Sequence, residues 1–273
     1  MDFLILILLF CFGVLIGSFL NVVILRYNTG LSFWSGRSQC LTCTHTLYWY
    51  DLFPLGTFLV NRMRCRYCET RLSSQYPLVE LGLGCLFALL GLVYEFELAM
   101  APLLFLSASI LSFLVLIFVY DLRHKIIPNA HVYSFIVLSG LYLLVTHFFH
   151  TPTNLLLDLL AGPLLAFPFW ALWFFSQGTW MGFGDVKLAW GIGWFLGFSA
   201  GVSAIILAFW IGAVVSLSII AYNKIQEKRA TSAWMKSLSM KSEIPFAPFL
   251  IAGCLIVFYC NISVIDLSIL FGG

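Results

Sequence analysis

The sequence has few charged residues. Only 10% of its 273 positions are Asp, Glu, Lys or Arg, whereas 62% are apolar, and the mean hydropathy is +1.00. A soluble domain carries about 25% charged residues, so this shortage excludes a water-soluble globular protein. The chain also lacks a recurring repeat and any low-complexity tract, which excludes solenoid and linker architectures. The composition is that of an integral membrane protein, with membrane lipid as its first partner.

The N-terminus lacks the features of a cleaved secretory signal. Asp2 stands where such a signal carries Lys or Arg, and no small-x-small cleavage site follows the first apolar run. We therefore expect residues 1–26 to be retained as a first transmembrane helix.

Long apolar runs predict about eight transmembrane helices. Segments able to span ~30 Å at 1.5 Å per residue lie near 3–25, 77–94, 101–120, 130–149, 154–176 and 246–268. Residues 186–222 would form one helix of about 55 Å, which is enough for two crossings with a turn at 197–201. The predicted fold class is an all-α polytopic membrane protein.

One face of this predicted arrangement has no basic residue. If the helices alternate from an outside N-terminus, all fourteen lysines and arginines fall in or beside the loops 26–76, 121–129, 177–185 and 223–245. The opposite side holds only acids: Asp2, Glu95, Glu97, Asp158 and Asp266. The positive-inside rule therefore places those four loops in the cytoplasm. A net charge of +2 gives no reason to expect nucleic acid as a partner.

Residues 27–76 form a cytoplasmic insert with no apolar run of spanning length. We divide the chain into 1–26 as the first helix, 27–76 as this insert, and 77–273 as a membrane core of about seven helices. About fifty residues bury little core, so such a segment usually needs a metal or disulfides to fold. The loop 223–245 is interpreted as a solvated connector that is helical at its start.

The insert carries two CxxC pairs, Cys40/Cys43 and Cys65/Cys68. Two such pairs provide a tetrahedral shell of four sulfurs, for which zinc is the expected metal. The alternatives are two disulfides or four free thiols, and a reducing cytoplasm disfavours the disulfides. Four sulfur ligands leave no open coordination position, so the predicted zinc site is structural.

Two aspartates lie at the ends of apolar runs. Asp121 follows the run 101–120, and Asp185 comes just before the run that starts at 186, so the predicted topology places both at the cytoplasmic face. Two carboxylates held close together share one proton, which is the chemistry of aspartic proteases. Gly182 and Gly184 would allow close approach of the backbone to a ligand. The alternative is that Asp185 only stabilises the N-terminus of its helix, and that Asp121 only pairs with a nearby basic side chain.

These motifs, in this order, resemble those of the bacterial type IV prepilin peptidases, also called leader peptidase/N-methyltransferases, over nearly the whole chain. Besides the CxxC pairs, the resemblance rests on 17–26 (GSFLNVVILR), 50–54 (YDLFP), 76–80 (YPLVE), 121–129 (DLRHKIIPN), 182–188 (GFGDVKL) and 244–249 (IPFAPF). It departs from the family at Phe53, where an aliphatic residue is usual.

The resemblance implies a multi-pass enzyme of the bacterial inner membrane, in the GxGD class of aspartic proteases. It would cut the basic leader from prepilins and pseudopilins after a glycine at the cytoplasmic face, with Asp121 and Asp185 as the catalytic pair. It would then methylate the new N-terminal amine with S-adenosylmethionine. By the same resemblance, Cys40, Cys43, Cys65 and Cys68 would be the zinc ligands.

The sequence itself shows no glycine-rich turn of the soluble methyltransferase kind, so methylation rests on the resemblance alone. Glu80 is a candidate for contacting the new amine, with pairing to an insert arginine as the alternative. Asn21 and Arg26 are candidates for substrate or cofactor contacts, with helix capping and membrane anchoring as the alternatives.

Two other functions fit some of the same residues. A presenilin-like intramembrane protease would also use Asp121 and the GxGD segment, but the four-cysteine insert and the absence of a Pro-Ala-Leu motif disfavour it. A transporter or membrane assembly factor would use the two acids as a proton relay. A cleavage assay separates these functions.

Overall fold

The computed structural model describes residues 3–40, 42–94, 100–149, 155–229 and 245–262. It divides into two compact units, Met1–Leu116 and Ile117–Gly273. The described elements are helical throughout, apart from two isolated backbone bridges in the insert. The helices are α1 (Phe3–Arg26), α2 (Gly56–Val60), α3 (Gln75–Val93), α4 (Ala101–His124), α5 (Asn129–Phe149), α6 (Leu155–Ser176), α7 (Phe183–Leu196), α8 (Phe198–Arg229) and α9 (Ala247–Cys260), with a short 3-10 helix η1 at Trp49–Asp51.

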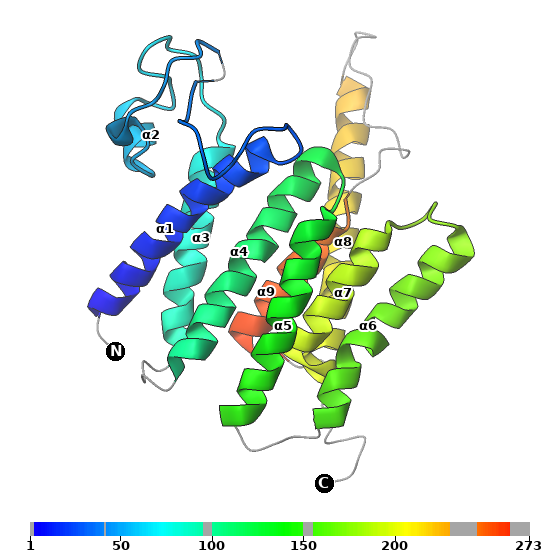
Figure 1. Cartoon of the computed structure of the whole chain (residues 1–273). Helices are drawn as coiled ribbons and strands as arrows, with labels where there is room; N and C mark the ends of the chain where they lie inside the picture. Colours follow the sequence, from blue (N-terminus) through cyan, green and yellow to red (C-terminus); the bar gives the residue numbers. More distant parts are fainter. Residues whose placement is uncertain (1–2, 41, 95–99, 150–154, 230–244, 263–273) are drawn as a thin grey trace. The chain divides into compact units, whose positions relative to one another are not determined.

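The first unit is built on the pair α1 and α3, which lie side by side (Figure 1). A side chain at Gly17 would come within 2.8 Å of the Cα of Glu80, so glycine at this position allows the two backbones to approach closely. Leu83 and Leu90 are fully buried in the unit. The insert follows α1 and leads back into α3, so the two helix ends support it.

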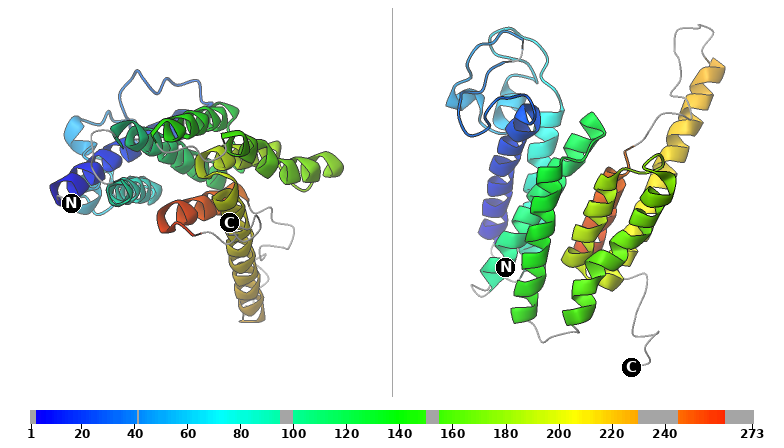
Figure 2. Two further views of the ribbon diagram at one scale, coloured as in Figure 1. Left: turned by 90° about the horizontal axis from the view of Figure 1, so that it is seen from below. Right: turned by 45° about the vertical axis from the view of Figure 1, so that its right-hand side comes forward.

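In the second unit α7 packs against α5, α6, α8 and α9. Gly193 of α7 allows the backbones of α7 and α6 to approach closely, because a Cβ there would lie 2.7 Å from the backbone oxygen of Ala161 in α6. Leu188, Ile192 and Phe135 are fully buried around this helix. Figure 2 shows that α8, with 32 residues, runs back along α7, which has 14, and extends well past the residue at which α7 starts. Asp185 therefore lies on the most enclosed helix of the unit.

Six of the described helices, namely α1, α3, α4, α5, α6 and α8, are long and apolar enough to cross a membrane. The helices α7 and α9 have 14 residues each, or about 21 Å at 1.5 Å per residue, which is shorter than the ~30 Å hydrocarbon layer. The structure thus supports a multi-pass membrane protein, and a total of eight crossings stays a prediction.

Several predicted helix boundaries were wrong. The helix expected to end at residue 120 continues to His124, and the helix expected from 186 begins at Phe183, so both aspartates lie within helices. Apolar runs mark what faces lipid or core, whereas a helix ends where its hydrogen bonds end. Here the Lys125 N–H bonds to the Asp121 carbonyl at 2.8 Å, and Lys125 adopts a φ of 55° that stops α4.

The turn after α7 is also shorter than predicted. It is made at Gly197, whose φ of 79° suits glycine, and Ser199 and Gly201 already belong to α8. The expected helical start of the 223–245 loop is confirmed as far as Arg229, and residues 230–244 lie outside the described residues. The last helix ends at Cys260 rather than running on toward 268, because Asn261 is left-handed; residues from 263 are not among those described.

Candidate active site and metal centre

The two predicted catalytic aspartates come from the ends of two different helices of the second unit. Asp121 lies in the last turn of α4, and Asp185 lies in the first turn of α7, after the N-cap residue Gly182. The Asp185 N–H donates to the Gly182 carbonyl at 3.2 Å, which sets the direction in which the helix starts. The local sequence thus presents one carboxylate at each helix end.

Both carboxyl groups are buried, with 5% of Asp121 and 8% of Asp185 exposed. They are close enough for the charge on Asp121 to act on Asp185. Within the described parts of the second unit, no ion pair joins Asp121 to Arg123 or Lys125. Burial without a cationic partner makes two simultaneous negative charges on this pair costly.

The loop between α4 and α5 packs directly on the start of α7. A Cβ on Gly184 would lie 2.8 Å from the Cβ of Ile127, so only glycine at 184 allows this loop to approach the helix. One turn further on, the Lys187 Nζ donates to the Oδ1 of Asn129, the first residue of α5, at 2.7 Å. Asp121 and Asp185 therefore sit on two chain segments that are in contact with each other.

These contacts were not predicted from the sequence. Gly184 was interpreted as leaving room for a ligand, whereas in the structure the room is filled by Ile127. Lys187 was counted only as a basic residue of the cytoplasmic face. Nothing in the spacing of the residues indicated its contact with Asn129.

We predict that Gly184→Ala lowers the thermal stability of the protein in detergent, by about 1–3 kcal/mol of unfolding free energy, because the added methyl overlaps Ile127. Gly182→Ala is the matched control, since the nearest atom to its added Cβ is 4.0 Å away and its φ of −75° suits alanine. The measurement is the midpoint of thermal unfolding. Equal midpoints for the two variants would show that Ile127 does not pack against position 184.

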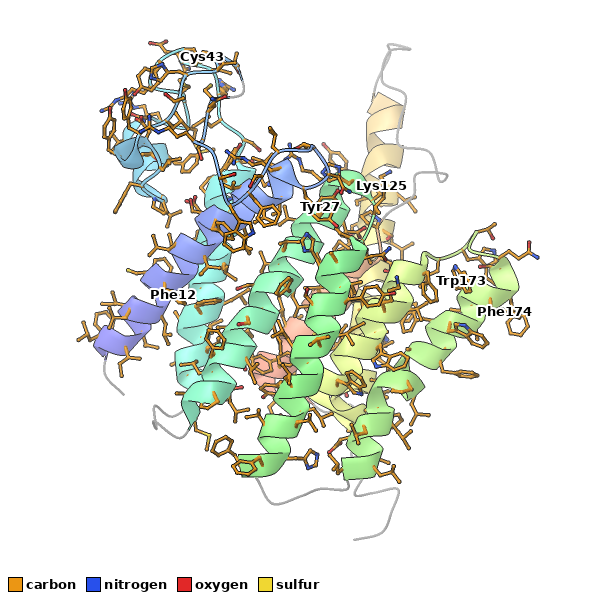
Figure 3. All side chains as sticks on the ribbon, in the orientation of Figure 1. Phe12, Tyr27, Cys43, Lys125, Trp173 and Phe174 are labelled. Carbon is orange, nitrogen blue, oxygen red and sulfur yellow. The ribbon has the colours of Figure 1, made fainter. Side chains whose placement is uncertain are left out.

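The four predicted metal ligands are gathered in the insert. The sulfur atoms of Cys40, Cys43, Cys65 and Cys68 all lie within 4.8 Å of one another. The Cys40 and Cys68 sulfurs are 3.8 Å apart, which matches the edge of a tetrahedron of about 3.8 Å built with zinc–sulfur bonds of about 2.3 Å. The donor set and its spacing therefore fit a zinc ion. In Figure 3, Cys43 marks the cluster in the insert, and Tyr27 is the residue that directly follows the end of α1.

The two CxxC segments adopt the same local fold. In each one the residue after the second cysteine, Thr44 or Glu69, has a φ near 55° and donates its N–H to the carbonyl of the first cysteine, at 2.9 or 3.0 Å. A backbone bridge closes each segment, between Gln39 and Thr46 and between Arg64 and Arg71. This repeated turn brings both sulfurs of a pair to one side.

Two of the four thiols have a lowered pKa, which favours their ionised form. A backbone hydrogen bond from Cys43 lowers the pKa of Cys40, and the contact with Thr70, 3.3 Å away, lowers the pKa of Cys68 to about 6. Thiolates are the forms that bind metal. Asp51 links η1 to the second CxxC segment, since its carboxylate accepts a hydrogen bond from the Tyr67 hydroxyl at 3.0 Å and lies 3.6 Å from the Arg66 guanidinium.

Two known family models match separate parts of this chain, one containing the four cysteines and the other containing both aspartates. Residues 11–94, which include the four cysteines, match the bacterial peptidase A24 N-terminal domain, and residues 108–217, which include both aspartates, match the type IV leader peptidase family. A prepilin leader peptidase/N-methyltransferase of Pectobacterium carotovorum subsp. carotovorum is 30% identical over 227 residues, which cover 75% of this chain and 80% of that protein. The chain belongs to the prepilin leader peptidase/N-methyltransferase family.

Two further members of this family extend the similarity. The protein of that name from Bacillus subtilis (strain 168) is 28% identical, and the match covers 96% of this chain and 97% of the relative. The one from Myxococcus xanthus (strain DK1622) is 33% identical over 77% of this chain and 61% of the relative. No solved structure matches. The resemblance seen in the sequence motifs is confirmed at the level of the family.

The three residues suggested for the family's methyl transfer lie in the first unit, and all of them make contacts within the protein. Glu80 is buried and its Oε2 accepts from the Leu55 N–H of the insert at 2.8 Å, not from an insert arginine. Asn21 is also buried and donates to the Tyr76 carbonyl at 3.1 Å. Arg26 donates to the carbonyls of Ser32 and Arg37.

These contacts bring Asn21 and Glu80 into the same interface between α1 and α3, whereas Arg26 folds back onto the loop that follows α1. Asn21 and Glu80 are both polar and less than 5% exposed, and Ser18 also hydrogen-bonds to Glu80. Buried polar groups of this kind within membrane helices often mark functional positions.

Proposed function

We propose that this chain removes the leader peptide from type IV prepilins and pseudopilins, cutting after a glycine, and then methylates the new N-terminal residue. The observation that carries the proposal is the pair of buried aspartates, close enough for their charges to interact, on either side of the contact between the α4–α5 loop and the α7 start. Membership of a leader peptidase family supplies the class of substrate.

The proposed cleavage step uses both carboxyl groups. Asp121 and Asp185 share one proton, the ionised member accepts a proton from a water molecule, and the protonated member polarises the carbonyl of the scissile bond. The water oxygen bonds to that carbonyl carbon, and the proton is finally delivered to the amine that leaves. Burial of the pair supports this division because it disfavours the doubly ionised state.

Zinc is proposed to have a structural role. Cys40, Cys43, Cys65 and Cys68 would hold the ion, and their four sulfurs complete its coordination. Among the described side chains of residues 27–76 only Cys40 and Cys65 are buried, so metal binding would supply much of the free energy that folds the insert. The insert would then be held in a fixed fold between the ends of α1 and α3.

Methylation is proposed to use residues other than the two aspartates. S-adenosylmethionine supplies an electrophilic methyl group, and the N-terminal amine of the cut pilin attacks it in its unprotonated form. Glu80 and Asn21 are the proposed contacts for the amine or the cofactor, with Arg26 at the adjacent helix end. Their common location in the first unit, buried and polar, supports the assignment.

We propose an inner-membrane location with the active site facing the cytoplasm. In the second unit the cationic side chains that the structure describes, Arg123, Lys125 and Lys187, belong to the same helix ends as Asp121 and Asp185. Lys125 and Trp173, labelled in Figure 3, lie toward this end. The hydrogen bond between His147 Nε2 and the Asp158 carboxylate lies at the opposite helix ends, between α5 and α6. This polarity agrees with the positive-inside rule.

The orientation predicts a labelling pattern. In intact cells, a thiol reagent that does not cross the inner membrane should leave a cysteine at position 35 (Ser35→Cys) unlabelled, and should label one at position 153 (Thr153→Cys). Disrupting the cells should expose position 35. Labelling of position 35 in intact cells would invert the proposed topology.

The two reactions can be followed together. Purified protein is incubated with a prepilin and methyl-labelled S-adenosylmethionine, and the pilin N-terminus is analysed. We expect a product that begins after the leader glycine and carries the labelled methyl group. An intact prepilin would exclude the proposed peptidase, and an unmethylated cut product would exclude the transferase alone.

A further inference from the structure

Lys187 makes three contacts at the start of α7, and two of them, with Asn129 and Tyr133, reach the start of α5. Its Nζ donates to Asn129 Oδ1 at 2.7 Å. The same ammonium lies 4.6 Å from the ring centroid of Tyr133 and 5.0 Å from that of Phe183, both within the range of a cation–π interaction. Lys187 is neither fully exposed nor free to rotate, because these three partners surround its charged end.

The chain between the two helices makes this contact important for Asp121. Only four residues, 125–128, separate the end of α4 at His124 from the start of α5 at Asn129. Asp121 lies in the last turn of α4, and Pro128, which is buried, restricts the final residue of the connection. Fixing Asn129 therefore fixes the short segment that carries Asp121.

On the other side, Lys187 is two residues after Asp185 in the same helix. The hydrogen bond to Asn129 and the packing of Ile127 on Gly184 therefore act at two successive points along the α7 start. One of these contacts resists separation of the two segments, and the other sets how closely they approach. Together they define the position of the Asp121 segment relative to Asp185.

We propose that Lys187, through Asn129, is a positioning residue for the aspartate pair, and this rests on the peptidase function proposed above. Lys187 makes none of the proposed bonds to the substrate. It keeps the two carboxyl groups at the separation that lets them share a proton. Small displacements of catalytic groups reduce turnover strongly, because the reacting geometry must be reached anew in each cycle.

The test is a double-mutant cycle on cleavage of a prepilin, with kcat and KM measured separately for each variant. Lys187→Met removes the donor, and Asn129→Leu removes the acceptor. We expect each change to lower kcat at least about tenfold and to leave KM within about twofold. Because both changes break the same bond, the double variant should have a kcat within about twofold of the lower single variant.

A conservative variant distinguishes positioning from a general loss of stability. Asn129→Asp keeps an acceptor oxygen opposite Lys187 and places an acid at a helix N-terminus, where it is favoured. It should retain kcat within about threefold of the unaltered protein when Lys187 is present, and should not rescue Lys187→Met. The matched control is Lys125→Met, which removes an exposed lysine close to Asp121 in the sequence.

The outcomes separate this proposal from the proposed function. If the unaltered protein does not cut the prepilin, the function itself is wrong. If it does, a full kcat for Lys187→Met, or losses in Lys187→Met and Asn129→Leu that simply multiply in the double variant, would overturn the positioning role. If Lys187→Met does not fold, Asn129→Leu and Asn129→Asp decide the question, and equal kcat values for these two would overturn it as well.

Discussion

Asp121→Asn and Asp185→Asn are each expected to lower leader cleavage by at least about 10³-fold in membranes, while the protein still inserts and accumulates. Asparagine is close in size to aspartate but neither ionises nor shares an acidic proton, so either change removes the proton transfers that cleavage requires. Both positions are buried helix ends without a salt bridge in the described parts of this unit, so loss of charge should cost little stability.

Cleavage is measured as the shortened pilin band over time, at matched protein levels. Asp158→Asn is the appropriate control, because Asp158 is an acid of the same unit that pairs with His147 at the opposite helix ends, where asparagine can still accept a hydrogen bond. We expect it to cut normally. Full cleavage by either active-site variant would remove that aspartate from the mechanism.

Removal of one cysteine from the cluster is expected to abolish metal binding. Cys40→Ser and Cys68→Ser each leave three sulfurs and an uncharged hydroxyl, so zinc measured by elemental analysis should fall from about one per chain to near zero. The insert should then become sensitive to limited proteolysis, because its proposed fold would depend on the ion more than on buried side chains.

Cys85→Ser is the matched control for this loss. Cys85 is exposed on α3 and does not belong to the four-sulfur cluster, so this variant should keep its full metal content. A zinc content near zero in the unaltered protein, or an unchanged content in Cys40→Ser, would contradict the metal centre. The cleavage assay on the same samples shows whether the insert affects the aspartates.

Features that depend on local spacing were predictable from the sequence. The four cysteines come as two short pairs, and each pair folds within six residues into the same turn, so their convergence follows from a pattern visible in the chain. The membrane location of most helices follows from apolar runs of sufficient length. The aspartates were identified because an ionisable side chain at the end of a membrane-spanning apolar run costs free energy, so such residues tend to have a function.

Features that depend on contacts between distant residues were not predictable. The contact of Ile127 with Gly184 and the bond from Lys187 to Asn129 join positions more than fifty residues apart, and no periodicity indicates them. Pairing with an insert arginine was the alternative considered for Glu80, but a backbone N–H contacts its carboxylate instead, and backbone groups carry no signal in the sequence. Helix ends were misplaced for a related reason, since hydropathy does not report where hydrogen bonding stops.

The dependence of leader cleavage on Asp185 is tested by giving the Asp185→Asn variant two substrates in parallel: an intact prepilin, and a pilin from which the leader has already been removed. Both reactions contain methyl-labelled S-adenosylmethionine, and labelled N-termini are counted. We predict label on the pilin that was already cut and none on the intact prepilin, because methylation would not use the aspartates and cleavage would depend on them. Labelled N-termini derived from the intact prepilin would contradict the assignment of Asp185 to the cleavage site.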